Sequence, residues 1–188
     1  MFKIIRKKLL LSFLTLIFAF IIAIPALAAT LDVKRVRQAK TRWCWAATSE
    51  MIGSYLNSSS GRTQWDIVAY IKGSNYPNSG GTVSDIENAI KYASGDTVTY
   101  KSGGICSWDV HTSQIANGNP LAVWMSWDNG HAHAVVCAGT KTTGGSNYLY
   151  IIDPAGDNTS QWYKYDSMKN GCTLQSGTGK YTTSFWKK

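Results

Sequence analysis

The chain has 188 residues, with 19 lysines and arginines against 11 aspartates and glutamates and a formal net charge of +8 at pH 7. This length suits a single domain with one sizeable core. The 4 cysteines form no Cys-x-x-Cys pair, which excludes the usual structural zinc frames, and the lack of repeats and low-complexity tracts excludes solenoid and disordered classes.

The first element along the chain has the layout of a secretory signal. A basic head is followed by an apolar run over residues 9–24 and by small residues at Ala26 and Ala28. This pattern predicts a signal over residues 1–28 that is cleaved after Ala28, and hence a secreted protein, with cell-wall association left open. An uncleaved anchor over residues 9–29 is the alternative, because a stretch of about 20 residues can span a bilayer. Cleavage would remove 4 basic residues and no acid, which leaves 15 − 11 = +4 for residues 29–188.

Residues 29–188 are predicted to form one domain whose first half is helical. Apolar residues recur at helical spacing over residues 43–56, and shorter helices are expected at 65–72, 85–92 and 108–116. Ser84 with Glu87 has the spacing of a capping box for the third helix.

The second half has the pattern of a sheet. Apolar, β-branched and aromatic runs at 121–127, 132–140 and 148–153 are separated by turn-forming residues, and further strands are expected at 161–165 and 181–186. Helices first and an antiparallel sheet afterwards is the α+β arrangement.

Cys44 lies between Trp43 and Trp45 at the predicted start of the first helix. A cysteine attacks as its thiolate, which is favoured by the positive end of a helix dipole or by a neighbouring imidazolium. A nucleophilic Cys44 therefore requires a histidine from elsewhere, a polar group that orients this histidine, and donors for the developing oxyanion. The alternative is that Cys44 is an inert buried cysteine between two tryptophans. Both tryptophans are expected to be packing residues, and Trp43 could also line a cleft.

Each of these partners has a candidate. Gln38 offers a side-chain amide six residues before Cys44, and His131 and His133 share one side of a predicted strand. Asp153 ends the following strand. A hairpin of these two strands would bring a histidine near the start of one strand beside an aspartate at the end of the other, which is the pairing that a catalytic triad needs.

Other interpretations of the same residues remain open. Asp153 could be a turn-forming residue ahead of Pro154. His131 and His133 could also grip a metal ion between them, but the sequence offers no further ligands nearby, so we expect neither a metal nor a cofactor.

The segment around Cys44 resembles the papain-like cysteine peptidases, and most of all the compact bacterial branches of AvrRpt2-type and C39-like peptidases. In these enzymes the oxyanion glutamine precedes the cysteine by six residues, as Gln38 precedes Cys44, and Trp-Ala follows it, as in Trp45 and Ala46.

The later motifs of these peptidases have matches as well. The His-Ala-Val strand with a glycine six residues after the histidine matches residues 133–135 and Gly139, and bacterial relatives have Asp-Pro where the chain has Asp153 and Pro154. By this alignment His133, and not His131, is the catalytic histidine. The chain departs from the papain pattern at residues 42–43, where Arg-Trp replaces Gly-Ser.

The resemblance covers roughly residues 36–156 and implies a papain-like fold, in which an N-terminal helical half carrying the nucleophile helix packs on a C-terminal antiparallel β-sheet. It also implies a secreted cysteine peptidase that hydrolyses protein or peptide substrates through Cys44, His133 and Asp153, with Gln38 as the oxyanion donor. A papain-like amidase acting on cell-wall peptides and a catalytically inactive binding module are the alternatives.

A basic run just before Cys44 could meet an anionic cell wall, although such runs are more often simply solvated. It consists of Lys34, Arg35, Arg37, Lys40 and Arg42. No nucleic-acid partner, no stable membrane association after cleavage and a monomeric state are expected. Cys137 is expected to be buried, and Cys106 and Cys172 could form a disulfide outside the cell, although sequence alone does not choose the pairing.

Overall fold

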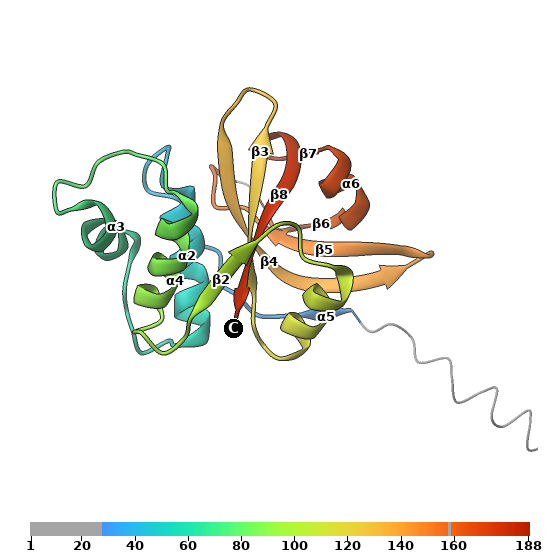
Figure 1. Ribbon diagram of the computed structural model, residues 1–188, viewed down its shortest axis with the longest axis horizontal. Helices are drawn as coiled ribbons and strands as arrows, with labels where there is room; N and C mark the ends of the chain where they lie inside the picture. The colour runs from blue at the N-terminus through green and yellow to red at the C-terminus, as the bar shows by residue number, and fades with distance from the viewer. Residues whose placement is uncertain (1–27, 158) are drawn as a thin grey trace, which may run out of the picture.

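The computed structural model describes residues 28–157 and 159–188, so residues 1–27 of the predicted signal lie outside the described residues. The helical half comes first, as expected, and the sheet follows (Figure 1). The helices are α2 (Cys44–Leu56), α3 (Gln64–Lys72), α4 (Val83–Ala93), α5 (Trp108–Ala116) and α6 (Tyr165–Asn170). The strands are β1 (Ala29–Thr30), β2 (Tyr100–Gly103), β3 (Leu121–Trp127), β4 (Ala132–Thr143), β5 (Ser146–Ile152), β6 (Gln161–Lys164), β7 (Cys172–Leu174) and β8 (Gly177–Lys187).

One antiparallel sheet organises the domain. Its order is β2-β8-β3-β4-β5-β6, with β1 pairing with β4 and β7 pairing with β8. The hairpin of β3 and β4 is central, and β5 lies against β4 in a register that pairs Val136 with Ile152. The predicted α+β class is therefore confirmed, and β4 and β5 form the expected hairpin.

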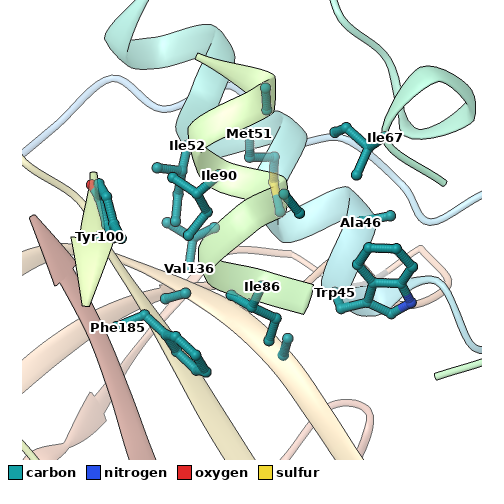
Figure 2. Close-up of a cluster of buried hydrophobic side chains, with 14 of the residues drawn as sticks. Trp45, Ala46, Met51, Ile52, Ile67, Ile86, Ile90, Tyr100, Val136 and Phe185 are labelled. Atoms are coloured by element: carbon teal, nitrogen blue, oxygen red, sulfur yellow. The ribbon is translucent and has the colours of Figure 1, made fainter. Parts of the chain in front are cut away.

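The two faces of the sheet carry different helices. On one face α2 and α4 cover a core that includes Val136 and Phe185, while α5 and α6 lie over the other face (Figures 1 and 2). Alternate residues of β4 face the two sides: Val136 belongs to the first core, and Val135 and Cys137 belong to the second. Burial on both faces explains why this strand is apolar along most of its length.

Close contact between α2 and α4 requires a glycine. A Cβ atom at Gly53 would lie only 2.5 Å from the carbonyl carbon of Ala93. Figure 2 shows the aliphatic side chains that fill the space between these helices and the sheet, among them Met51 and Ile52 of α2 and Ile90 of α4. The backbones of α2 and α4 approach closely at this point, which holds the helix bearing Cys44 firmly against its neighbour.

The start of α4 differs from the prediction. The capping box consists of Thr82 and Asp85, two residues earlier than the predicted pair of Ser84 and Glu87. Both pairs have suitable spacing, but Asp85 also accepts a hydrogen bond from Lys72 Nζ of α3 at 2.6 Å. A contact between helices therefore favours the earlier start.

Several elements were not predicted. The strands β1, β2 and β7 are too short to show a pattern of their own and exist by pairing with β4 or β8. Helix α6 begins at Tyr165, which the sequence pattern assigned to a strand. Among residues 28–157 and 159–188, no helix has the length and apolar character needed to cross a bilayer.

Candidate active site

A cleft of about 440 Å³ opens where the N-terminus of α2 meets the hairpin of β3 and β4. Cys44 is the first residue of α2 and lies half-buried in this cleft. The first backbone N–H groups of a helix have no partner within the helix, and the N-cap residue Trp43 supplies no side-chain cap. The start of α2 is therefore a polar, donor-rich wall beside the Cys44 sulfur.

The two tryptophans beside Cys44 anchor the loop ahead of α4. Trp43 Nε1 donates to the Pro77 carbonyl at 2.9 Å, and Trp45 Nε1 donates to the Ser79 carbonyl at 3.1 Å. A Cβ atom at Gly81 would lie 2.6 Å from the ring of Trp45. Both tryptophans are packing residues, as expected. The cleft is lined by Trp45 and not, as expected, by Trp43, which is fully buried.

A buried hydrogen bond sets α2 against β4. Thr48, one helical turn after Cys44, donates its hydroxyl to the carbonyl of Ala134 at 3.0 Å. Because Ala134 directly follows His133, this bond fixes the position of Cys44 relative to the His133 ring. The two residues come from opposite halves of the domain and are 89 positions apart in the sequence.

His133 lies between Cys44 and Asp153. Its Nε2 atom is 2.8 Å from Asp153 Oδ1, and both side chains are almost completely buried. Burial alone would lower the pKa of His133, but the hydrogen bond to Asp153 and the proximity of Cys44 outweigh it and raise this pKa from 6.5 to about 9. Burial would raise the pKa of Asp153, but hydrogen bonding and attraction to His133 lower it below its usual value. The geometry thus favours a charged imidazolium between an aspartate and a sulfur.

Further residues, with no signal in the sequence, surround this pair. Asp153 Oδ2 accepts a hydrogen bond from Ser176 Oγ at 2.6 Å, and Oδ1 accepts a second bond from the Ala155 N–H at 2.9 Å. The Trp127 ring stacks on the His133 ring, with centroids 5.7 Å apart and an interplanar angle of 22°. Ser176 lies more than 20 positions after Asp153, so only the folded chain brings them together.

Comparison with known proteins identifies the family of the chain. The sequence pattern of the Peptidase_C39-like family matches residues 30–177. The chain belongs to this family. It is therefore a cysteine peptidase with a papain-like fold. No curated protein sequence matches the chain.

Three solved structures are similar to the chain to different degrees, and the first of them shares its fold. A C39-like peptidase from Bacillus anthracis superposes with a TM-score of 0.55 at 12% identity, covering 86% of this chain and 98% of that one. A mite allergen structure, from work on Blo t 1 and Der p 1, covers 83% of this chain and 67% of that one, with a TM-score of 0.46 at 11% identity. Procathepsin L 3 of Tenebrio molitor covers 88% and 71%, with a TM-score of 0.42 at 13% identity.

Gln38 of this C39-like peptidase lies at the cleft, but its amide is already engaged. Gln38 Nε2 donates to the carbonyls of Lys40 at 3.0 Å and Thr41 at 2.9 Å, while Oε1 is buried without a partner among the described residues. The backbone N–H of Gln38 donates to the Pro154 carbonyl at 2.9 Å. The structure thus brings Gln38 to the site and ties it to the loop after Asp153.

His131 also lines the cleft, but in a different setting. It lies exposed in the turn before β4, and its backbone N–H is held by Asn129 Oδ1 at 3.1 Å. His131 is more solvated than the buried His133, as the sequence suggested. No group of three or more potential metal-ligating side chains occurs among the residues that the structure describes.

The N-terminal arm holds the loop that carries Asp153. Arg35 donates to the backbone carbonyls of Asp153 at 2.8 Å, Ala155 at 3.2 Å and Gly156 at 2.8 Å. The predicted solvated or wall-binding run is therefore partly structural.

The side chains of three other basic residues of the run also have contacts within the chain, whereas Arg42 is held only through its backbone N–H, which donates to Asn78 Oδ1 at 3.0 Å, among the described residues. Lys34 pairs with Asp32, Arg37 pairs with Asp157, and Lys40 donates to the Tyr76 carbonyl. Binding of this run to a cell wall stays a prediction.

All four cysteines of this peptidase are free thiols in the structure. Cys137 is fully buried, as expected, and Cys106 and Cys172 are not joined by the disulfide that the sequence left open. Buried on the face of the sheet away from the cleft, Cys137 Sγ lies 3.8 Å from His111 Nδ1.

Proposed function

We propose that the protein hydrolyses peptide bonds of protein or peptide substrates, with Cys44 as nucleophile, His133 as acid and base, and Asp153 as the group that orients His133. The observation that carries the proposal is the position of His133, which is hydrogen-bonded to Asp153 at 2.8 Å and lines the same cleft as Cys44. A histidine held in this way is the acid and base that a cysteine nucleophile requires.

The proposed reaction has two halves. The Cys44 thiolate attacks the carbonyl carbon of the scissile bond, and His133 then gives its proton to the leaving amine as the C–N bond breaks. Water next attacks the resulting thioester while His133 takes a proton from it, and the C–S bond breaks to release the acid. The thiolate–imidazolium pair of Cys44 and His133 is thereby restored.

The oxyanion formed in both halves needs hydrogen-bond donors. The backbone N–H of Cys44, at the start of α2, is the first candidate, and the amide of Gln38 is the second. Since both protons of Gln38 Nε2 face the carbonyls of Lys40 and Thr41, we propose that one of these bonds is shared with the substrate oxygen. Gln38→Ala should lower kcat by roughly 100-fold while leaving alkylation of Cys44 largely intact.

The decisive experiment compares His133→Ala with His131→Ala as its matched control. The rate of iodoacetamide alkylation at Cys44 should be high well below pH 8.5 in the wild type and in His131→Ala. In His133→Ala it should rise only near pH 8.5, where ordinary thiols ionise, and peptide cleavage should vanish. If the two variants exchange these behaviours, His131 is the base and the assignment is wrong.

We also propose that the protein is secreted after cleavage following Ala28, that it acts as a monomer and that it binds neither nucleic acid nor a membrane stably. N-terminal sequencing of protein from the culture medium should give Ala29 as the first residue. A membrane-retained chain that still begins at Met1 would contradict secretion.

Cleavage of casein rather than of purified cell wall would separate an endopeptidase from a cell-wall amidase. The engagement of four of the five basic residues at 34–42 within the chain favours the endopeptidase.

A further inference from the structure

The turn between β7 and β8 touches the triad in two places. Leu174 pairs with Gly177, so Gln175 and Ser176 form a two-residue turn at the end of this hairpin. Ser176 Oγ donates to Asp153 Oδ2 at 2.6 Å, and Ser176 lines the cleft. The next residue, Gly177, lies under the ring of Trp127, where a Cβ atom would be 3.0 Å from the indole.

The same turn is tied to the loops on either side of it. The side chain of Gln175 makes two hydrogen bonds with the backbone of Thr159. Its Oε1 accepts from the Thr159 N–H at 3.0 Å, and its Nε2 donates to the Thr159 carbonyl at 2.6 Å. The carbonyl of Thr178 accepts a bond of 3.0 Å from the N–H of Asp128, in the turn that follows Trp127. The hairpin therefore has little freedom to move relative to either Asp153 or Trp127.

We propose that this turn is a positioning element of the active site, in which Ser176 holds the free oxygen of Asp153 and Gly177 seats the Trp127 ring on His133. The carboxylate then has both oxygens held, Oδ1 by His133 and the Ala155 N–H, and Oδ2 by Ser176. With rotation about its Cβ–Cγ bond prevented, Asp153 presents Oδ1 to His133 in one orientation. Ser176 acts through Asp153 and is a positioning residue.

The groups that surround the Asp153 carboxylate come from several elements. They are His133 of β4, Tyr163 of β6, the hydroxyl of Ser176 and the N–H of Ala155, while Arg35 of the N-terminal arm binds the backbone carbonyl of Asp153. Among these, the Ser176 hydrogen bond is one of the contacts that lower the pKa of Asp153. Its removal should therefore make the carboxylate protonate at a higher pH.

The test rests on the proposed peptidase activity and uses three variants. Ser176→Ala removes the hydroxyl and Ser176→Thr retains one. Thr178→Ala removes a hydroxyl of the same hairpin, whose one hydrogen bond among the described residues joins it to Thr173 Oγ1 at 3.0 Å. In Ser176→Ala, kcat should fall about 10-fold with little change in KM, because a hydrogen bond to a charged group is lost. The acid limb of the pH profile should move to higher pH, Ser176→Thr should restore both values, and Thr178→Ala should match the wild type.

The same variants are compared by the pH dependence of Cys44 alkylation, which needs no peptide. If the wild type cleaves no peptide but its alkylation profile shifts in Ser176→Ala, the proposed substrate class is wrong and the positioning role stands. If Ser176→Ala matches Thr178→Ala in both kcat and the alkylation profile, the positioning role is overturned.

A second inference concerns Arg42, the residue of the basic run that faces the cleft. Arg42 is exposed, lines the cleft two residues before Cys44, and has no ion-pair partner among the described residues. None of the residues lining the cleft is acidic. A guanidinium beside the nucleophile is thus left to pair with a carboxylate of the substrate.

We infer that the peptidase prefers substrates with a carboxylate within about two residues of the scissile bond. Two peptides that differ only by Glu or Gln at one such position should differ several-fold in kcat/KM, and the difference should shrink as salt is added. Arg42→Gln should abolish the preference and Arg42→Glu should reverse it. Lys91→Gln, which removes a charge outside the cleft, should leave it unchanged.

Binding of both peptides to Cys44→Ala separates recognition from turnover. A Glu preference in binding without cleavage would support the role of Arg42 and contradict the proposed hydrolysis of that peptide. Equal kcat/KM values for both peptides at every position tested would overturn the inference.

Discussion

The charge on His133 should make the stability of the protein depend on pH in a way that one substitution removes. The pKa of His133 is raised to about 9 in the folded protein from 6.5. Its stabilising effect is therefore fully present below pH 6.5 and is lost as the pH rises through 9. At about 1.36 kcal/mol per pH unit, this difference corresponds to roughly 3 kcal/mol of unfolding free energy.

Asp153→Asn keeps the size of the side chain and removes the charge that faces His133. We expect the pKa of His133 to fall in this variant, because burial is then opposed by Cys44 alone. Urea unfolding at pH 6 and pH 9.5 should show a loss of unfolding free energy of about 3 kcal/mol across this window in the wild type, and a clearly smaller loss in Asp153→Asn. Other groups that titrate in the window are common to both proteins and cancel in the comparison.

The pKa of His133 can also be measured directly from the pH dependence of its NMR signals. Burial lowers the pKa of His111 to about 4, so this ring stays neutral throughout the window, and His131→Ala removes the remaining histidine signal. If wild type and Asp153→Asn lose equal stability between pH 6 and pH 9.5, the aspartate does not hold the charge on His133 and the reasoning is refuted.

Three further predictions concern the elements that hold the site. Gly53→Ala should lower the unfolding free energy by about 1–3 kcal/mol in urea denaturation, since its Cβ would collide with Ala93. Thr48→Val should lower the unfolding free energy by about 1–3 kcal/mol, because the buried hydrogen bond to the Ala134 carbonyl sets α2 against β4. It should also lower kcat, measured on the folded variant. Arg35→Met should speed backbone amide exchange in the loop after β5, whose carbonyls it binds, and unchanged exchange would show that other contacts hold this loop.

Local patterns in the sequence were enough to predict much of this protein. The 3.6-residue spacing of apolar residues predicted α2 to within one residue of its start, and the apolar runs after Pro120 predicted β3, β4 and β5. These signals are local, because helix periodicity and turn residues act over a few positions. The order of Gln38, Cys44, His133 and Asp153 along the chain was likewise sufficient to indicate a papain-like peptidase.

The tertiary structure alone decided how these residues are supported. Ser176 and Arg35 show no local pattern, and their partner Asp153 is far from both in the sequence, so their contacts exist only once the β7–β8 hairpin and the N-terminal arm have packed. The two histidines also show what local sequence patterns leave open and tertiary packing decides. Periodicity predicted both on one side of a strand, so that only the family resemblance favoured His133. In the structure β4 begins at Ala132, and its packing against α2 and β5 buries His133 against Asp153 while His131, before the strand, stays in solvent.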